Sequence, residues 1–195
     1  RWTYTYDANG NKTSETDYKG NTTTYTYDAK NNLTKITDAN GNTEEMTYDS
    51  FSRITSKKDK NGNITRYRYI GNNPKPSEIE DARGNITRYT YDGMRRQTSE
   101  TDARGFTTSI TYDRTGRKLK ETDKRGNETS YTYSSRGIVT KIKDRENNET
   151  TFTYDNVGNI LTGTDGESNT LTYEYDQNYN KILEKNLPNE KRMYL

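Results

Sequence analysis

The chain has 195 residues, of which only 26% are hydrophobic, 31% are charged and 18 are tyrosine. Apolar usage near half is typical of globular domains, so a packed two-layer interior is excluded. With 31 basic and 29 acidic residues interspersed, the chain lacks the basic footprint of a nucleic-acid-binding protein, and without Cys it has neither a disulfide framework nor a thiolate metal site.

An aromatic-x-Tyr motif recurs through the whole sequence. The interval between the second tyrosines is 21 residues, except for one interval of 22 between Tyr69 and Tyr91. A period in this range is typical of repeat arrays. The second tyrosines are Tyr6, Tyr27, Tyr48, Tyr69, Tyr91, Tyr112, Tyr133, Tyr154 and Tyr175.

Each repeat contains two strand-like pieces separated by turn signals. In the second repeat, Asn21–Asp28 and Leu33–Asp38 are predicted strands, and turns follow at 29–32 and 39–42. We therefore predict an all-β array of antiparallel hairpins, with about two strands per 21-residue unit. The array forms a single domain of about nine repeats over residues 1–195. Because Arg1 lies almost inside a strand, we expect a fragment of a longer chain.

The first strand of each repeat alternates between an aromatic face and a polar face. The second strand is less regular, because Leu33 and Ile36 are three residues apart, which a bulge or a strong local twist would explain. Aromatic residues of the first position, together with the second tyrosines above, form the expected repeat signature. These residues include Tyr25, Tyr67, Tyr89, Tyr131 and Tyr173.

Turn chemistry completes this signature. An Asp that follows the tyrosine can accept a hydrogen bond from the backbone N–H two residues later. This Asp occurs as Asp7, Asp28, Asp49, Asp92, Asp113, Asp155 and Asp176. The other turn carries Gly20, Gly41, Gly62, Gly84, Gly105 and Gly126. Asn147 and Ser168 later replace this glycine, so we expect that turn to loosen.

Two places depart from the pattern. Residues 70–77 contain two prolines and the single inserted residue, which predicts a lengthened loop. Residues 186–190 degrade the repeat, and Tyr194 then returns at the first aromatic position, so we expect the chain to stop inside a strand.

The sequence offers little catalytic or metal-binding chemistry. No His or Cys is present, and the acidic residues recur at the same turns, so we expect no enzyme, no cofactor and no metal site. Asp7–Asn11 and Asp38–Asn42 resemble the start of a calcium loop, but the Gly is fourth rather than sixth, which favours hairpin turns. A weak calcium effect remains an alternative.

Asn-x-Ser/Thr sequons and the tyrosines allow further alternatives. The sequon asparagines are either glycan acceptors or turn residues that precede a strand, and the turn assignment is favoured. The tyrosines either pack as a ladder and line a wall, or stack sugars or nucleobases. The sequons begin at Asn11, Asn21, Asn32, Asn63, Asn85, Asn127 and Asn148.

These motifs resemble the RHS/YD-repeat family, whose pattern appears here at residues 112–117, 122–126 and 129–133. The resemblance covers nine successive copies. It implies a β-sheet strip that spirals into a hollow shell, as in toxin complexes and polymorphic toxins, in wall-associated bacterial proteins and in teneurin-like YD repeats. Toxin members also carry a self-cleaving core with an Asp-Pro site, and this sequence has no Asp-Pro dipeptide.

A curved strip also follows from strand geometry. About 18 strands, each roughly 4.8 Å wide, make a sheet about 85 Å across, which must curl, split or close. Strand geometry therefore favours a curved antiparallel sheet, and the resemblance implies that this sheet is a segment of a hollow β-shell. The role that the resemblance implies is that of a secreted or surface bacterial module enclosing a toxin domain of the parent chain. The alternative is an adhesin that binds glycans or a partner protein, and exposed edge strands also allow self-association.

Overall fold

The computed structural model describes residues 1–187, which form eighteen β-strands and no helix. The prediction of two strands per repeat is therefore confirmed. By its internal contacts the chain comprises two compact units, Arg1–Gly105 and Phe106–Leu195. Residues 1–187 contain no helix long and apolar enough to cross a membrane.

The first unit contains ten strands, and each strand pairs antiparallel with the next one along the chain. It is an open meander built only from neighbouring hairpins. The strands are β1 (Thr3–Tyr6), β2 (Lys12–Thr16), β3 (Thr22–Tyr27), β4 (Leu33–Thr37), β5 (Thr43–Tyr48), β6 (Ile54–Lys58), β7 (Ile64–Arg68), β8 (Glu78–Glu80), β9 (Ile86–Tyr91) and β10 (Gln97–Thr101).

The second unit repeats this arrangement with eight strands, again paired antiparallel in chain order. The strands are β11 (Thr107–Tyr112), β12 (Lys118–Thr122), β13 (Glu128–Tyr133), β14 (Val139–Lys143), β15 (Glu149–Tyr154), β16 (Ile160–Thr164), β17 (Thr170–Tyr175) and β18 (Lys181–Leu187).

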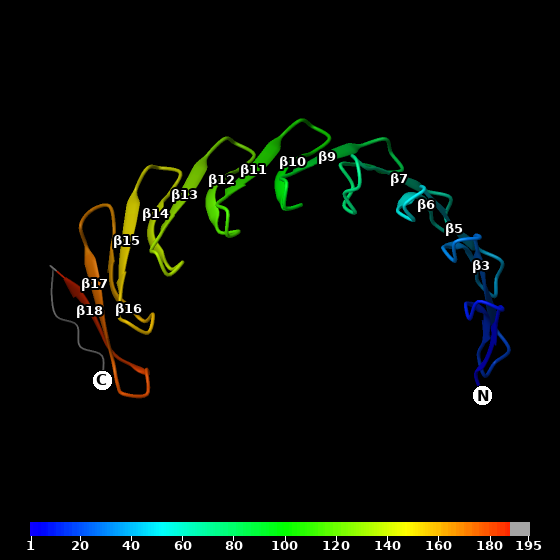
Figure 1. Cartoon of the computed structure of the whole chain (residues 1–195), viewed down its shortest axis with the longest axis horizontal. Helices are drawn as coiled ribbons and strands as arrows, with labels where there is room; N and C mark the ends of the chain where they lie inside the picture. Colours follow the sequence, from blue (N-terminus) through cyan, green and yellow to red (C-terminus); the bar gives the residue numbers. More distant parts are fainter. Residues whose placement is uncertain (188–195) are drawn as a thin grey trace. The chain divides into compact units, whose positions relative to one another are not determined.

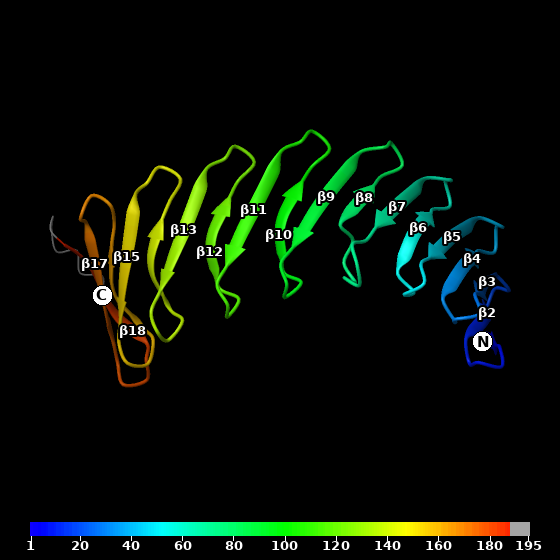
Figure 2. The same cartoon turned by 45° about the horizontal axis from the view of Figure 1, so that its top comes forward.

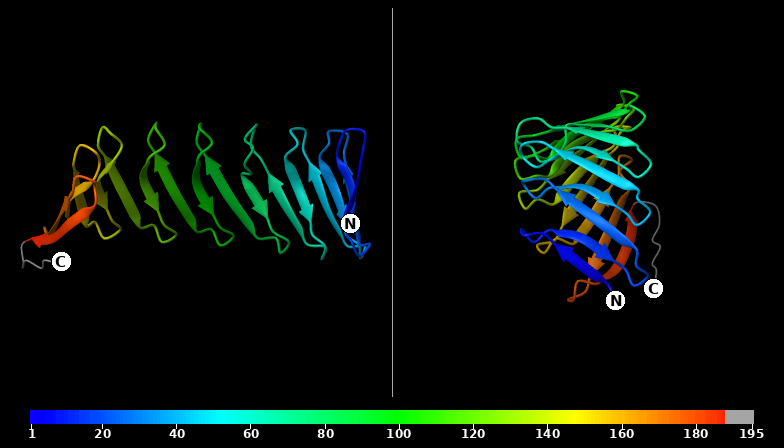
Figure 3. Two further views of the ribbon diagram at one scale, coloured as in Figure 1. Left: turned by 90° about the horizontal axis from the view of Figure 1, so that it is seen from below. Right: turned by 90° about the vertical axis from the view of Figure 1, so that its right-hand side faces the viewer.

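Within each unit the strands form one layer, and successive hairpins turn rather than lie in one plane (Figure 1). The connecting loops alternate between the two margins of the sheet, as Figures 2 and 3 show for β3 to β9 and for β11 to β17. Curvature of this kind follows from the right-handed twist of each strand pair. It is the expected behaviour of a wide sheet without a second layer.

A β-bulge at the start of the second strand explains its irregular spacing. Tyr27 pairs with Leu33, but the preceding Thr26 pairs with Lys35, so the second strand carries one extra residue. The extra residue brings Leu33 and Ile36 to the same face, where they oppose Tyr27 and Tyr25. The same register shift recurs in seven other hairpins of the described chain. Of the two explanations that the sequence allowed, a bulge or a strong local twist, the structure shows the bulge.

The sheet has almost no interior. Met46, at the first aromatic position of β5, is the one described hydrophobic side chain that counts as buried, and it is 9% exposed. Most other residues of the aromatic face are half-buried. Because the residues that the structure describes form no second layer over this face within either unit, stability must come from contacts between adjacent hairpins.

Each hairpin loop is held by hydrogen bonds within the loop. In the first loop, the Asp7 carboxylate accepts bonds from the backbone N–H of Asn9 at 2.9 Å and of Asn11 at 2.8 Å. The Asn11 side-chain amide donates to the same carboxylate at 2.9 Å. These bonds lower the pKa of Asp7, with the Asn11 amide as the largest cause. Gly10 closes the turn at a φ of 83°.

The turn does not loosen where glycine is lost, so that expectation was wrong. Asn147 and Ser168 adopt φ angles of 67° and 68° and keep the backbone bond to Asp144 and Asp165, at 3.0 and 3.1 Å. The Asp side chain accepts its usual loop bonds in both turns. The aspartate therefore holds the turn even where the left-handed residue is not glycine.

The lengthened loop is also confirmed. Residues 69–77 contain no strand, and β7 and β8 flank them. Tyr69 itself lies one residue beyond β7. β18 extends through Asn186, at which the pattern was expected to degrade, to Leu187. The strand predicted around Tyr194 lies outside the described residues.

We expect Ser168→Gly to stabilise the second unit by about 0.5–1 kcal/mol. A left-handed backbone costs an L-residue roughly 1–2 kcal/mol, and the greater freedom of glycine in the unfolded chain offsets part of this gain. The reverse change at the same turn position, Gly126→Ser, should destabilise by a similar amount, since its φ is 84° and no atom lies within 4 Å of an added Cβ. Urea denaturation of both variants measures this, and equal midpoints would contradict it.

Candidate functional site

The recurring contact of this molecule joins each hairpin to the one before it. The hydroxyl of the second tyrosine donates to a backbone carbonyl 15 residues earlier, at 2.6–2.9 Å. The bonded pairs are Tyr27 with Lys12, Tyr48 with Leu33, Tyr69 with Ile54, Tyr91 with Pro76, Tyr133 with Lys118, and Tyr154 with Val139. We call this contact the tyrosine junction.

In five of the six junctions the accepting carbonyl lies at the bulge, and in the sixth it is that of Pro76, in the lengthened loop before β8. Lys12, Leu33 and Ile54 are each the first residue of a second strand, where the register shifts. A bulge takes backbone groups out of the regular ladder, and an unpaired carbonyl needs another donor. The phenol supplies that donor while its ring packs on the sheet face. The bulge and the tyrosine therefore act together to join one hairpin to the next.

The tyrosines predicted from the sequence do not all form the tyrosine junction in the same way. Tyr6 occupies the same strand position at the start of the first unit but is 61% exposed. Tyr112 and Tyr175 end β11 and β17 in the same way. The first-position aromatics Tyr67, Tyr89 and Tyr173 lie on the same face at the middle of their strands.

Two first-position tyrosines bind an ion pair on the preceding hairpin. The Tyr25 hydroxyl donates to Glu15 at 2.7 Å, and the Lys12 ammonium lies 4.6 Å from the centre of the Tyr25 ring. Lys12 and Glu15 are themselves paired across the bulge. Tyr131 repeats the arrangement with Glu121 at 2.7 Å. Burial and this bond raise the pKa of Tyr131 to about 12.

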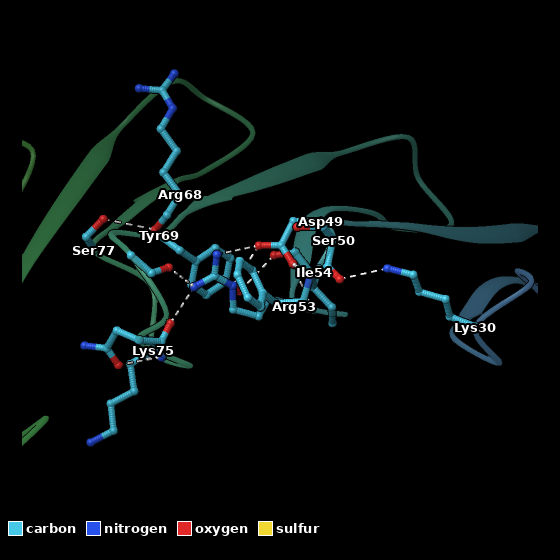
Figure 4. Close-up of polar contacts among 12 residues, drawn as sticks. Lys30, Asp49, Ser50, Arg53, Ile54, Arg68, Tyr69, Lys75 and Ser77 are labelled. Carbon is cyan, nitrogen blue, oxygen red and sulfur yellow. Dashed lines mark hydrogen bonds and ion pairs between the residues drawn. The ribbon is translucent and has the colours of Figure 1, made fainter.

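Arg53 fastens the lengthened loop to the preceding hairpin (Figure 4). Its guanidinium pairs with Asp49 at 2.6 Å and donates to the carbonyls of Gly71 and Asn73, both at 2.8 Å. It also lies 4.4 Å from the centre of the Tyr69 ring. A planar guanidinium makes all of these contacts at once, which a lysine ammonium does not. The loop is thus held by a side chain of the neighbouring repeat.

Other basic residues form hydrogen bonds or ring contacts with the next repeat. Lys30 donates to the carbonyl of Ser50 at 2.7 Å (Figure 4), and Arg136 donates to that of Asn156 at 2.6 Å. Arg117 pairs with Asp113 and lies 4.9 Å from the centre of the Tyr133 ring. These contacts again join consecutive repeats and reach no further.

The acidic and amide side chains of the loops form hydrogen bonds that stabilise the loops. The expected hydrogen bond from the N–H two residues later is made to Asp28, Asp49, Asp92, Asp113, Asp155 and Asp176. The amides of the sequon asparagines donate to the same kind of aspartate, as Asn32 does to Asp28 at 2.9 Å. Residues 1–187 hold no group of three metal-ligating side chains.

A hollow on the aromatic face of the second unit lies where a strand residue has no side chain. Gly163 lies opposite Phe152, at the position where β4 and β14 carry isoleucine. The missing side chain leaves an open hollow of about 410 Å³ beside Phe152, Leu171 and Tyr173. It contains no pair of groups suited to acid–base chemistry, so it offers at most a contact for an apolar side chain.

Comparisons with known proteins agree with this architecture. The family model described as RHS Repeat matches residues 6–43 and 75–108. The crystal structure of TcdB2-TccC3 without its hypervariable C-terminal region is 16% identical with a TM-score of 0.65, covering 98% of this chain and 12% of that one. The comparison with curated proteins found no match.

A second solved structure shows the same fold. The Photorhabdus luminescens Tc holotoxin pore, carrying a TccC3 mutation, is 16% identical with a TM-score of 0.52, and covers 97% of this chain and 12% of that one. This chain thus spans a small part of the proteins that it resembles.

We expect Tyr48→Phe to destabilise the first unit by about 0.5–1.5 kcal/mol, because it removes one hydrogen bond and leaves the Leu33 carbonyl without its phenol donor. Tyr6→Phe is the matched control, since this exposed phenol makes no tyrosine junction within the described chain. Urea denaturation compares the two variants. Equal losses would show that the ring, rather than the hydroxyl, carries the contact.

The sheet should also lose stability in alkali. Burial raises the pKa of Tyr48, Tyr69, Tyr91 and Tyr154 above 10.0, and that of Tyr131 to about 12. A raised pKa means that the neutral phenol stabilises the fold below pH 10, and that this stability is lost as the pH rises through the folded-state pKa. Circular dichroism and phenolate absorbance should therefore change together between about pH 10 and 12. Phenolate formation near pH 10 with an unchanged fold would contradict this.

Proposed function

Because the RHS Repeat model matches residues 6–43 and 75–108, we propose that the chain belongs to the RHS/YD-repeat family and forms part of the wall of a β-shell that encloses a toxin domain supplied by the rest of a longer protein. In this proposal the two units continue a single repeat array over residues 1–195, and the wall itself catalyses no reaction. Its partners are the remainder of the parent chain and the enclosed domain.

The tyrosine junction is the observation that carries this proposal. It fastens hairpin to hairpin in one layer without building an interior, which is what a wall requires and what a globular enzyme does not. The polar face is also bonded within itself, as in the hydroxyl cluster of Thr47, Thr55 and Ser56 at 2.7–2.8 Å. The side chains of the polar face therefore satisfy one another's hydrogen bonds without a covering layer.

The comparisons support the setting of the proposal. The similar solved structures carry toxin-complex names, and one of them is described as lacking a hypervariable C-terminal region. Since this chain covers 12% of either one, a whole enclosure needs further wall from the same parent. We accordingly propose a secreted or cell-surface bacterial protein.

Limited proteolysis of the full-length parent tests the enclosure. The region outside the repeats should be digested at least about tenfold more slowly in the intact parent than when it is expressed alone. A parent carrying Tyr27→Phe, Tyr48→Phe and Tyr69→Phe, which weakens three consecutive junctions, should lose part of this protection while keeping its β-sheet circular dichroism. Equal digestion rates with and without the repeats would refute enclosure.

A further inference from the structure

Three neighbouring loops of the first unit expose a large apolar side chain at the same margin of the sheet. They are the loops after β5, β7 and β9, which leave the strands on one side (Figure 2). Phe51, Ile70 and Met94 are 65%, 75% and 66% exposed in them. With two strands per hairpin, neighbouring loops are roughly 10 Å apart, so these positions form a row about 20 Å long. We call loops 49–53, 70–77 and 92–96 the apolar margin.

This row is not the ordinary composition of the loops. At the opposite margin of the same hairpins, residues 38–42, 59–63 and 81–85 are Asp, Ala, Asn, Gly, Lys and Arg only. In the two earlier loops on the side of the apolar margin, the second residue after the aspartate is Asn9 or Lys30 rather than an apolar residue. Single apolar side chains scattered over a surface are normal, whereas a row of them indicates an interaction surface.

Ile70 occupies the position at which the other loops on this side of the first unit carry the aspartate that closes the turn. Arg53 holds the loop instead, through its bonds to the carbonyls of Gly71 and Asn73, and the N–H of Asn73 donates to the Ile70 carbonyl at 3.3 Å. The loop is therefore closed without the side chain of Ile70. Isoleucine in place of aspartate adds apolar surface to the margin and removes a negative charge from it.

The charges of the apolar margin are complementary to an anionic surface. Each of its two aspartates pairs with the arginine four residues later, at 2.6 Å. Lys75 and Arg95 are exposed, and the three loops contain no further carboxylate. The Lys75 ammonium donates to the carbonyl of Arg95 at 3.3 Å, and this neutral acceptor leaves its positive charge uncompensated. Exposed apolar side chains thus lie beside an excess of positive charge.

This combination matches the interface of an anionic lipid bilayer. Apolar side chains enter the boundary between headgroups and acyl chains, and Lys and Arg bind the anionic headgroups. The three apolar side chains lie on separate loops, so a folded protein partner would need a pocket for each of them at the right spacing. A fluid bilayer receives side chains at any spacing, and the observations therefore favour lipid.

We propose that the apolar margin is a peripheral membrane-binding surface for bilayers rich in anionic phospholipid. Phe51, Ile70 and Met94 insert into the interfacial layer, and Lys75 and Arg95 contact the headgroups. The bonds of Arg53 and Lys75 to the next loop fix the three loops relative to one another, so little conformational freedom is lost on binding. This inference does not depend on enclosure of a toxin, and either proposal can fail without the other.

Vesicle co-sedimentation tests the binding itself. The chain of residues 1–195 should sediment with vesicles of phosphatidylglycerol and phosphatidylcholine, and should stay in solution with vesicles of phosphatidylcholine alone. Raising the salt concentration from about 0.1 M to about 1 M should weaken binding at least about tenfold, because it screens the headgroup attraction. A chain that does not bind the anionic vesicles at low salt would refute the proposal.

A serine variant tests insertion of the apolar side chains. Phe51→Ser, Ile70→Ser and Met94→Ser together should weaken vesicle binding by about tenfold or more, because less apolar surface leaves water. Leu119→Ser with Val157→Ser is the control, since it removes side chains of the second unit that are 42% and 62% exposed, and it should leave binding unchanged. Full binding by the triple variant would mean adsorption by charge alone, which is incompatible with insertion.

A glutamine variant tests the position of the charges. Lys75→Gln with Arg95→Gln should weaken binding to anionic vesicles by about tenfold or more. Arg83→Gln with Arg104→Gln makes the same change in net charge in exposed loops of the opposite margin, so it should have little effect. Equal losses from the two pairs would show that the whole chain is attracted without a specific surface, contrary to the proposal.

A relocated tryptophan reports on insertion directly. The chain has one tryptophan, so Trp2→Phe with Met94→Trp places the only indole on the apolar margin. Its emission should shift to the blue with anionic vesicles and should be quenched by brominated acyl chains. Trp2→Phe with Arg83→Trp is the matched control and should show neither change. If polyglutamate bound the apolar margin and vesicles did not, the occupant would be an acidic protein and the assignment to lipid would be wrong.

Discussion

A phenol hydroxyl bonded to the bulge carbonyl of the preceding hairpin is the constraint on which this sheet depends. An isolated two-stranded hairpin is marginal in water, and residues 1–187 supply no second layer to cover it. Each tyrosine junction contributes about 0.5–1.5 kcal/mol and joins only neighbours. The contributions accumulate along the chain, as in other repeat proteins, and they do so without a hydrophobic interior. A molecule built this way is suited to be a wall.

The loop bonds act within each hairpin, and the tyrosine junctions act between hairpins. Within a hairpin, Asp7 and its equivalents bond the loop backbone and set the register of the two strands. Between hairpins, Tyr27 and its equivalents join each hairpin to the one before it. Local bonds therefore define each hairpin, and the tyrosines hold consecutive hairpins together. Arg53 adds a third level, because it holds a loop that differs from all the others.

Most of this fold could be predicted from the sequence, but the central contact could not. The period revealed the hairpins, and the spacing of Leu33 and Ile36 indicated the bulge. The acceptor of the junction is a backbone carbonyl, which Lys12, Leu33 and Pro76 supply equally well, so no side-chain pattern marks it. We wrongly expected the turn at Ser168 to loosen, because we assumed that glycine holds this turn. The Asp165 carboxylate holds it instead.

The extra residue of the 22-residue repeat lies between Tyr69 and Pro76, yet Tyr91 still bonds a carbonyl 15 positions back. In this repeat the added residue thus enters the chain before the acceptor and not between acceptor and donor. Insertions and deletions at this margin change what protrudes from the sheet without disturbing how the strands are joined. Over evolutionary time, this margin can acquire new surface features while the ribbon behind it stays the same.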